Sequence, residues 1–552
     1  MKTERKQRMK IIFENEEYEI PENKTIKEAF QDKINSEDII AARYNNFIAS
    51  LNHPIKKDGT ICFIKRTEKD GRIIYIRGLL YLMSKAFEEL YPECYLTVNY
   101  QLSNAMFCEI ENKEITQEMI DKVKSKMKQI IEQDLPIRKV EMTPEEAQKF
   151  YAKSESIRGR LQADIHKAKV SLYYCEDYYN YFYGTMPIST GFAKVFDLTK
   201  FRDGFLLEYP SSAEPNVIQK NNKESLKIVS AMDEYDELYK LMKINTVYRL
   251  NKKIKEGNLK ELILFSEAIH EKKIAEIANK IKQRKNVRMV LIAGPTSSGK
   301  TTFAGKLGMA LRVQGIKPVT ISVDNYFVER EQNPIDENGN YDFECIEAID
   351  VDLFNRQLLD LLAGKEVELP TFDFTTGHKQ YLGKKLKLEN DEILIIEGIH
   401  CLNDELTNQI AKENKFKIYI SDLTVLNIDY YNRISTTDTR LIRRISRDYQ
   451  FRNYSALHTL KMWSSVNKGE QKYIFPYQEE ADCMFNSSII YELAVLKDFV
   501  LPLLEKIDDS EPEYSEARRL IDMLQYFESV KEIDLIPNNS LLREFIGGSI
   551  YE

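Results

Sequence analysis

The sequence predicts an α/β domain, with a parallel sheet covered by helices on both faces, after two smaller units rich in strand signals. Two observations predict this fold. A glycine-rich stretch, "GPTSSGKTT" at residues 294–302, directly follows the apolar run "VRMVLIA". Further short apolar runs, "PVTISV", "EILIIEG" and "KFKIYIS", then alternate with helical patterns, which is typical of parallel strands connected by helices.

Residues 1–66 are expected to form a small β-grasp-like domain. The segment "KIIFENEEYEI" predicts a hairpin, and "KKDGTICFI" predicts a turn that leads into a strand. Between them, Thr25 and Glu28 stand at capping-box spacing, so a short helix is expected to begin there.

The remaining boundaries follow from changes in periodicity. Residues 67–215 mix helical and strand patterns, which predicts an α+β domain. Residues 216–285 are expected to form a helical connector, because apolar residues at 274, 277, 278 and 281 recur at helical spacing. Residues 286–499 hold the α/β pattern, and residues 500–552 are expected to form a helical C-terminal extension.

Composition excludes several classes of protein. The 552 residues are 43% hydrophobic and 30% charged, as in ordinary globular proteins. No apolar run approaches the roughly eighteen residues needed to cross a bilayer, so we expect a cytoplasmic protein without a membrane partner. The net charge of −8 argues against a general nucleic-acid binder. Seven cysteines without a C-x-x-C pair indicate reduced thiols rather than a zinc site.

The glycine-rich stretch has the spacing of a phosphate-binding loop. Its backbone N–H groups are expected to surround phosphate oxygens, with Lys300 reaching the β- and γ-phosphates and the Thr301 hydroxyl binding Mg²⁺. The helix that follows adds the positive end of its dipole. The predicted nucleotide-binding residues are Gly294, Pro295, Thr296, Ser297, Ser298, Gly299, Lys300, Thr301 and Thr302.

Two acidic residues follow predicted strands of the same sheet. Asp324 comes after "ISV", and Glu397 ends "ILIIE". The carboxyl ends of parallel strands are where such sheets bind ligands, and a carboxylate there can accept a proton or help to hold Mg²⁺. The alternative is that each residue caps the helix that follows it.

The segment "PTFDFTTGHK" contains two phenylalanines, Phe372 and Phe374, that flank an acid. They predict either an aromatic wall for a flat base or an ordinary strand with both rings in the core, and the pattern alone favours the strand.

A row of arginines recurs at helical spacing after the fourth strand. The row could close over a triphosphate and neutralise the charge that develops in transfer. The alternative is a solvated helix in which Asp438 and Asp448 are the partners. The arginines are Arg440, Arg443, Arg444 and Arg447.

Together with "NYDFECIEAID" and "DTRLIRRISRD", these motifs resemble the uridine kinase and phosphoribulokinase family over residues 287–490. The resemblance implies a Mg²⁺/ATP-dependent kinase that phosphorylates the 5′-hydroxyl of a nucleoside, uridine or cytidine. It implies that Asp324 is the catalytic base, aided by Lys300 and Arg443, and that Glu397 and Thr301 associate with Mg²⁺. The same resemblance places further residues at the nucleotide, Arg444 and Arg447, and at the substrate, Tyr341, Asp342, Phe372, Phe374, His378 and Arg440.

Two other functions remain open on the sequence. A kinase for a sugar phosphate would share the fold, although it would need a basic pocket in place of the aromatic "FDF" segment. A nucleotide-gated RNA-binding or regulatory protein would bind ATP without turnover, and the intact Asp324 and the arginine row argue against it.

The N-terminal half resembles two modules of the translation apparatus. Residues 1–66 resemble the TGS domain, and residues 67–215 resemble the editing domain of threonyl-tRNA synthetases, most clearly in "VSLYYCEDYYNYFYGTMPISTG". At the positions of that family's histidines and cysteine stand residues that cannot bind zinc, so no zinc is expected. They are Gly78, Leu82, Phe182 and Met186.

The whole arrangement resembles long bacterial uridine kinase-like proteins. ATP and a nucleoside are the expected partners. Nucleic acid is not expected as a principal partner, although the N-terminal half could retain weak RNA binding, and homo-oligomerisation is left open.

Overall fold

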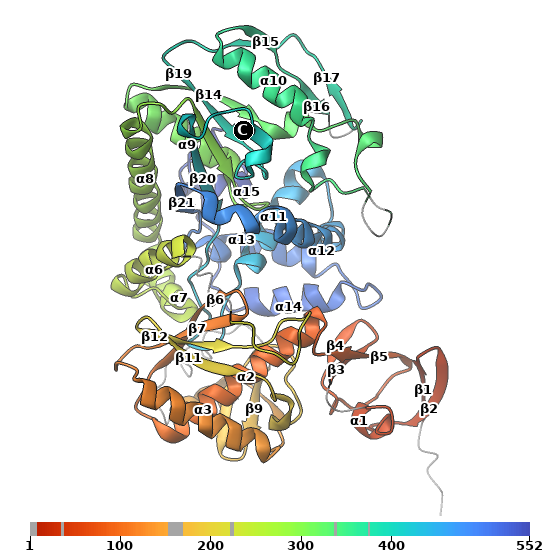
Figure 1. The fold of residues 1–552 in the computed structure, drawn as a ribbon. Helices are drawn as coiled ribbons and strands as arrows, with labels where there is room; N and C mark the ends of the chain where they lie inside the picture. Colours follow the sequence, from red (N-terminus) through yellow and green to blue (C-terminus); the bar gives the residue numbers. More distant parts are fainter. Residues whose placement is uncertain are drawn as a thin grey trace, which may run out of the picture.

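The computed structural model describes residues 8–34, 38–152, 169–220, 226–335, 339, 341–373 and 376–551. The two N-terminal units lie at one end of the molecule and the parallel sheet lies at the other (Figure 1). The chain's last described residues return to the sheet domain, where the Tyr551 ring packs against Gly305 of the helix that spans residues 300–313.

The first unit is a five-stranded sheet with one short helix. The strand order is β2-β1-β5-β3-β4, and only β1 and β5 run parallel. The predicted capping box is confirmed, because Thr25 and Glu28 exchange side-chain and backbone hydrogen bonds. The elements are β1 (Arg8–Phe13), β2 (Glu16–Pro21), α1 (Ile26–Ala29), β3 (Ile39–Tyr44), β4 (Phe47–Ala49) and β5 (Gly59–Lys65).

The second unit packs two antiparallel sheets around a long helix, α2. The sheets have the orders β11-β12-β7-β6 and β10-β9-β8. The elements are α2 (Lys69–Leu90), β6 (Leu96–Leu102), β7 (Ala105–Ile110), α3 (Gln117–Glu132), β8 (Arg138–Met142), α4 (Pro144–Ala152), β9 (Val170–Cys175), β10 (Tyr178–Tyr181), β11 (Asp197–Phe201) and β12 (Gly204–Glu208).

Three helices connect this unit to the parallel sheet. They are α6 (Leu226–Leu241), α7 (Val247–Lys255) and α8 (Leu259–Gln283). The predicted apolar face of α8 is confirmed, since Ile274, Ile277, Ala278 and Ile281 are all buried. The connector is therefore part of the core, and α8 packs on α9 of the sheet domain.

The C-terminal region contains the predicted parallel sheet, in the order β14-β19-β13-β20-β21. Central strand β13 is buried on both faces: Met289, Leu291 and Ala293 join one apolar cluster, while Val290 and Ile292 join another. The strands are β13 (Met289–Ala293), β14 (Lys317–Ser322), β19 (Glu392–Glu397), β20 (Lys415–Ser421) and β21 (Cys483–Asn486).

Helices cover both faces of this sheet. Helix α9 contributes to one apolar cluster and α10 to the other. The helices are α9 (Lys300–Val313), α10 (Val351–Leu362), α11 (Thr436–Arg452), α12 (Ala456–Tyr473) and α13 (Glu492–Leu504). Two short hairpins, β15 (Glu366–Glu368) with β18 (Lys385–Lys387) and β16 (Thr371–Asp373) with β17 (His378–Gln380), extend from it.

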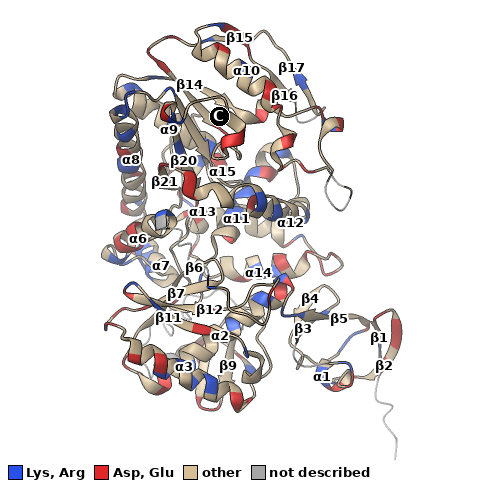
Figure 2. Ribbon diagram, viewed as in Figure 1, with Lys and Arg blue, Asp and Glu red and all other residues tan. Residues whose placement is uncertain are grey.

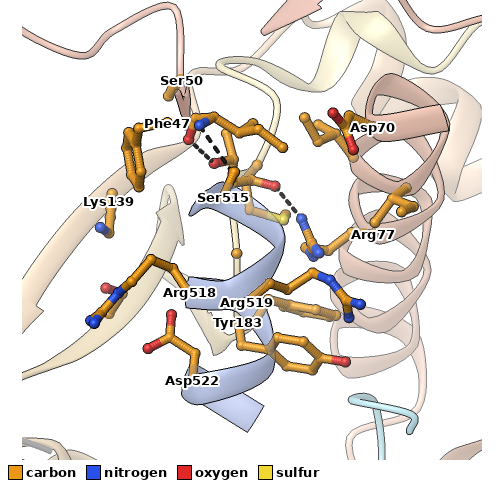
Figure 3. A pocket seen from close by; sticks show the side chains of 18 of the residues that line it. Phe47, Ser50, Asp70, Arg77, Lys139, Tyr183, Ser515, Arg518, Arg519 and Asp522 are labelled. Carbon is orange, nitrogen blue, oxygen red and sulfur yellow. Dashed lines mark hydrogen bonds between the residues drawn. The ribbon is translucent and has the colours of Figure 1, made fainter. Parts of the chain in front are cut away.

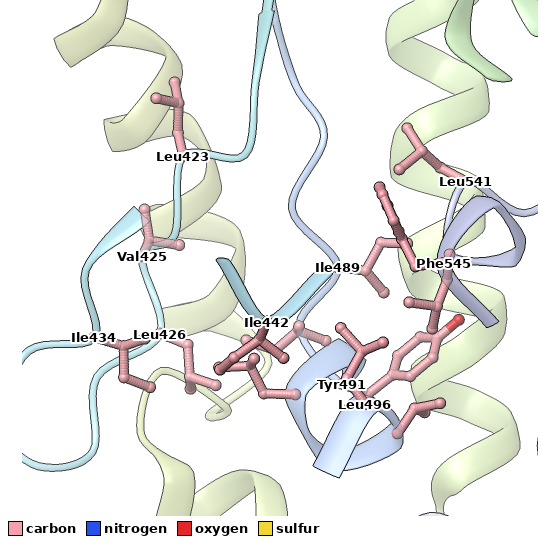
Figure 4. Close-up of a cluster of buried hydrophobic side chains, with 14 of the residues drawn as sticks. Leu423, Val425, Leu426, Ile434, Ile442, Ile489, Tyr491, Leu496, Leu541 and Phe545 are labelled. Carbon is pink, nitrogen blue, oxygen red and sulfur yellow. The ribbon is translucent and has the colours of Figure 1, made fainter. Parts of the chain in front are cut away.

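The chain beyond α13 is only partly helical, with α14 (Tyr514–Leu524) and the short α15 (Arg543–Ile546). This segment packs into the core of the sheet domain: Leu541 and Phe545 join the cluster that contains Ile489, Tyr491 and Leu496 (Figure 4).

Candidate active site

The predicted phosphate-binding loop lies between β13 and α9. A Cβ on Gly294 would lie 1.9 Å from the Ile420 carbonyl oxygen, so only glycine fits where the loop leaves the sheet. Gly299 has a φ of +84° and Ser297 a φ of +57°, and these left-handed residues turn the chain into the helix. The sequence "GPTSSGK" therefore forms a tight turn at the N-terminus of α9.

Several polar groups of this loop lack protein partners. The hydroxyl oxygens of Ser297 and Ser298 are buried and make no hydrogen bond with described residues. Lys300 Nζ donates to the carbonyl oxygens of Gly294 and Pro295, at 3.0 and 3.1 Å, and thus folds back across the loop. Buried hydroxyls without partners are costly, and here they fit a phosphate at a helix N-terminus.

The C-terminal segment contacts the same helix end. Glu544 Oε2 accepts hydrogen bonds from the Thr302 hydroxyl and backbone N–H, at 2.8 and 3.3 Å. A Cβ on Gly299 would meet the Leu541 side chain at 2.6 Å. No sequence signal predicted that residues 541 and 544 would reach the loop.

The two predicted carboxylates lie on neighbouring strands. Glu397 ends β19 opposite Ser322, the last residue of β14, and Asp324 follows two residues later. Burial, together with the charge of Asp324, raises the pKa of Glu397 to about 7. Desolvation also raises the pKa of Asp324, although Lys300 and arginines of α11 lower it. The site thus holds two mutually repelling acids beside one lysine.

Two further acids complete this group, and the sequence analysis did not single out either one. Burial, reinforced by the charge of Glu470, raises the pKa of Glu344 to about 7. Glu470 Oε1 accepts the Thr296 N–H at 3.0 Å. Glu344 lies inside the motif "NYDFECIEAID", so the motif could have identified it as a site residue. Glu470 lies in a polar helical pattern, which gave no reason to place it in the site.

Two residues of the predicted arginine row lie beneath the phosphate-binding loop. Arg440 donates to the Thr296 carbonyl oxygen at 2.9 Å and forms a very short ion pair with Glu470, and both side chains are only 1% exposed. Arg443 donates to the Ser297 carbonyl oxygen at 3.3 Å and pairs with Glu492 at 2.5 Å. This placement departs from the expected row over the triphosphate, because both charges are met by carboxylates inside the protein.

Two other arginines of α11 lie near the acids of the site, and Figure 2 shows Lys and Arg along this helix. Arg444 and Arg447 pair with the buried Asp448, at 3.1 and 3.2 Å. Arg447 lowers the pKa of Asp324, and Arg444 lowers the pKa of Glu344. Helical spacing therefore divides the row between a buried face and a face directed at the acids.

The predicted acceptor-side residues lie on irregular segments and on the β16–β17 hairpin. Asp342 Oδ2 accepts the Tyr473 hydroxyl at 2.8 Å, and Tyr341 is exposed. The rings of Phe372 and Phe327 lie 5.5 Å apart, and His378 Nδ1 lies 2.5 Å from Glu329 Oε2. Phe374 lies outside the described residues.

In the N-terminal half, the four positions at which the resembling family has metal ligands are apolar. Leu82, Phe182 and Met186 are buried in one hydrophobic cluster. A Cβ on Gly78 would lie 2.3 Å from the Phe192 ring. These side chains offer no ligand atom of the kind that zinc prefers.

Within the described ranges, no three His, Cys, Asp or Glu side chains form a group that could hold a metal ion by themselves. The loop end nevertheless fits Mg²⁺ that arrives with a triphosphate: Thr301 is exposed at the start of α9, and two carboxylates, Asp324 and Glu397, lie at the ends of the neighbouring strands. None of the described helices is both long and apolar enough to cross a membrane.

Comparison with known proteins agrees with this division of the chain. Residues 289–492 match the sequence model of the "Phosphoribulokinase / Uridine kinase family". A uridine kinase of Ureaplasma urealyticum is 29% identical over 195 residues, which cover 35% of this chain and 85% of that protein. A uridine kinase of Schizosaccharomyces pombe is 31% identical over 186 residues, 33% of this chain and 37% of that protein.

Two further similarities concern the N-terminal part and the solved structures. The N-terminal part is similar to a threonine–tRNA ligase of Rubrobacter xylanophilus, with 28% identity over 162 residues, 29% of this chain and 25% of that enzyme. A solved structure of a possible uridine kinase from Bacillus stearothermophilus is 21% identical and covers 39% of this chain and 98% of that chain, with a TM-score of 0.27. The C-terminal region of this chain, residues 289–492, is thus the part that matches the model of the phosphoribulokinase/uridine kinase family.

Proposed function

We propose that the chain is a Mg²⁺/ATP-dependent nucleoside kinase that phosphorylates the 5′-hydroxyl of uridine or cytidine. The observation that carries the proposal is the grouping of Asp324 and Glu397 at the ends of neighbouring strands, beside Lys300 of the phosphate-binding loop. The uridine kinases among its relatives support the choice of acceptor.

In the proposed mechanism, the loop N–H groups and Lys300 hold the triphosphate. Thr301 and Glu397 would hold Mg²⁺, which would supply neutralisation of the phosphate charge. Asp324 orients the 5′-hydroxyl and takes its proton. Its raised pKa brings this base closer to neutral pH, where general bases act best.

The arginines divide into two roles in this proposal. Arg444 and Arg447 face the acids and neutralise the charge that develops on the transferring phosphoryl group. Arg440 and Arg443 act indirectly, because they fix the carbonyl oxygens of Thr296 and Ser297. Tyr341, Asp342, Phe372 and His378 are proposed to contact the nucleoside.

The decisive experiment measures ATP consumption by the purified chain against uridine, cytidine, purine nucleosides and sugar phosphates, and identifies the product by mass spectrometry. A nucleoside 5′-monophosphate is the expected product, and Asp324→Asn should abolish most turnover. Turnover of sugar phosphates alone, or ATP binding without any product, would contradict the proposal.

A further inference from the structure

A large cavity lies where the two N-terminal units meet helices α12 and α14. Its volume is about 1220 Å³, large enough for a drug-sized ligand. Strands β4 and β8, helices α2 and α14, and the loop after β10 form its walls, and Figure 3 shows their side chains converging.

The cavity is held open by specific contacts between these parts. The Ile48 carbonyl oxygen accepts the Thr185 hydroxyl at 2.9 Å. The Ile48 N–H donates to the Ser515 hydroxyl oxygen at 3.3 Å. One residue of the first unit thus links the second unit to α14, and the walls form one connected structure.

Arg77 of α2 contributes a charge to this cavity that the protein does not neutralise. Its Nη1 donates to the Thr185 carbonyl oxygen at 2.6 Å, and its guanidinium lies 5.9 Å from the centre of the Tyr183 ring. Among the described residues, no carboxylate lies within ion-pair distance of it. Burial and the nearby Arg519 lower the pKa of Arg77.

The neighbouring Arg519, in contrast, is neutralised by carboxylates of the protein. It is paired with Asp438 at 2.6 Å and with Glu516 at 2.8 Å, so both acids close to it are already engaged. An enclosed charge without a counter-charge costs free energy. An anionic ligand that enters the cavity could therefore form an ion pair with Arg77.

The rest of the wall agrees with an anionic ligand that contains a ring. The lining has eight Lys and Arg against six Asp and Glu, although acidic residues exceed basic ones over the whole chain, 87 to 79. Lys139 and Arg518 are exposed at the cavity. Phe47 is 44% exposed and adds a flat apolar surface on which a ring can stack.

We propose that this cavity binds a small phosphate-bearing ring compound of the nucleoside monophosphate class, with its phosphate paired to Arg77 and its ring against Phe47. The cavity borders the proposed kinase site, because the Trp463 ring lines it and lies 5.6 Å from the Arg440 guanidinium, which bonds to Thr296 of the phosphate-binding loop. It is bounded by α12, the helix whose Glu470 also holds the phosphate-binding loop.

The test is isothermal titration calorimetry with adenosine 5′-monophosphate and, separately, with inorganic phosphate, on the full chain. All variants carry Lys300→Ala, which removes the phosphate contact of the loop and keeps the cavity intact. We expect binding of the monophosphate in this background and a loss of about 10- to 100-fold in affinity on Arg77→Met, the range for a hydrogen bond between charged groups.

Two further variants distinguish a loss of binding at the cavity from a loss of folded protein. Arg518→Gln changes an exposed side chain at the cavity and should weaken binding several-fold. Arg356→Gln changes an exposed helical arginine on α10, outside the cavity, and should leave binding unchanged.

Three results would overturn the inference. The first is no binding of either probe at millimolar concentration, and the second is equal affinity of the monophosphate for the cavity variants and the parent. The third is Arg77-dependent binding of an RNA oligonucleotide without a terminal phosphate, in the absence of monophosphate binding. Because binding is measured without turnover, failure of the kinase proposal leaves this test unaffected.

Discussion

The buried pair of Arg440 and Glu470 gives the sharpest test of how the phosphate-binding loop is held. Both side chains are 1% exposed, and each also bonds to Thr296, one to its carbonyl oxygen and one to its N–H. Glu470→Gln keeps an acceptor for the N–H and removes the charge, so Arg440 is left buried without a counter-ion. Breaking such a pair costs about 3–5 kcal/mol. For a domain of this size, each kcal/mol lowers the melting temperature by about 2–4 °C.

Differential scanning calorimetry should therefore show the transition of the sheet domain lowered by roughly 6–20 °C in Glu470→Gln. The matched control is the double variant Arg440→Met/Glu470→Leu, which should recover most of the loss, because an apolar replacement of a buried pair is often neutral. A single variant that melts within about 2 °C of the parent would refute the reasoning, as would a double variant that melts below the single one.

The remaining predictions concern the proposed reaction. Lys300→Ala should abolish phosphoryl transfer in a coupled ATPase assay while circular dichroism stays unchanged, because the lysine serves the phosphates; retained turnover would exclude this role. Asp324→Asn should lower kcat by about 100-fold or more with little change in ATP affinity, and a collapse of ATP affinity would make Asp324 a Mg²⁺ ligand instead. Phe372→Ala should raise KM for the nucleoside far more than KM for ATP, since a stacked base is worth about 1–3 kcal/mol; an equal change in both would indicate core packing. Glu344 has a folded pKa of about 7, above its usual value, so its stabilising effect is present at low pH and is lost as pH rises through 7. The melting temperature of Glu344→Gln relative to the parent should thus increase from pH 5 to pH 8, and a pH-independent difference would contradict the assigned pKa.

Local patterns predicted the parts of the fold that depend on local physics. Gly294 and Gly299 are required by backbone geometry within a few residues, and the alternation of β13 between two clusters follows from an unbroken apolar run. The capping box at Thr25 is also local. The placement of Asp324 near Glu397 followed from one rule, that parallel strands end at the same edge of a sheet.

What the sequence could not predict depends on contacts between distant residues. Helical spacing showed that the arginines of α11 share faces, but not which face would be buried. That is decided by Glu470 and Glu492, which lie 30 and 49 residues further along the chain from the arginines they pair with. Likewise, the pairing of His378 with Glu329 joins residues 49 apart and draws the ring toward a carboxylate.

The contact of Leu541 and Glu544 with the helix end of the phosphate-binding loop bears on how such a protein can be inherited. The family match ends at residue 492, well before these residues. A gene fusion or recombination event that moved only the matched segment would remove the carboxylate that accepts from the Thr302 hydroxyl. It would also remove the Leu541 side chain that packs on Gly299. The segment beyond residue 492 is therefore physically part of the sheet domain, and a shortened chain that ends at the family match would lack these contacts.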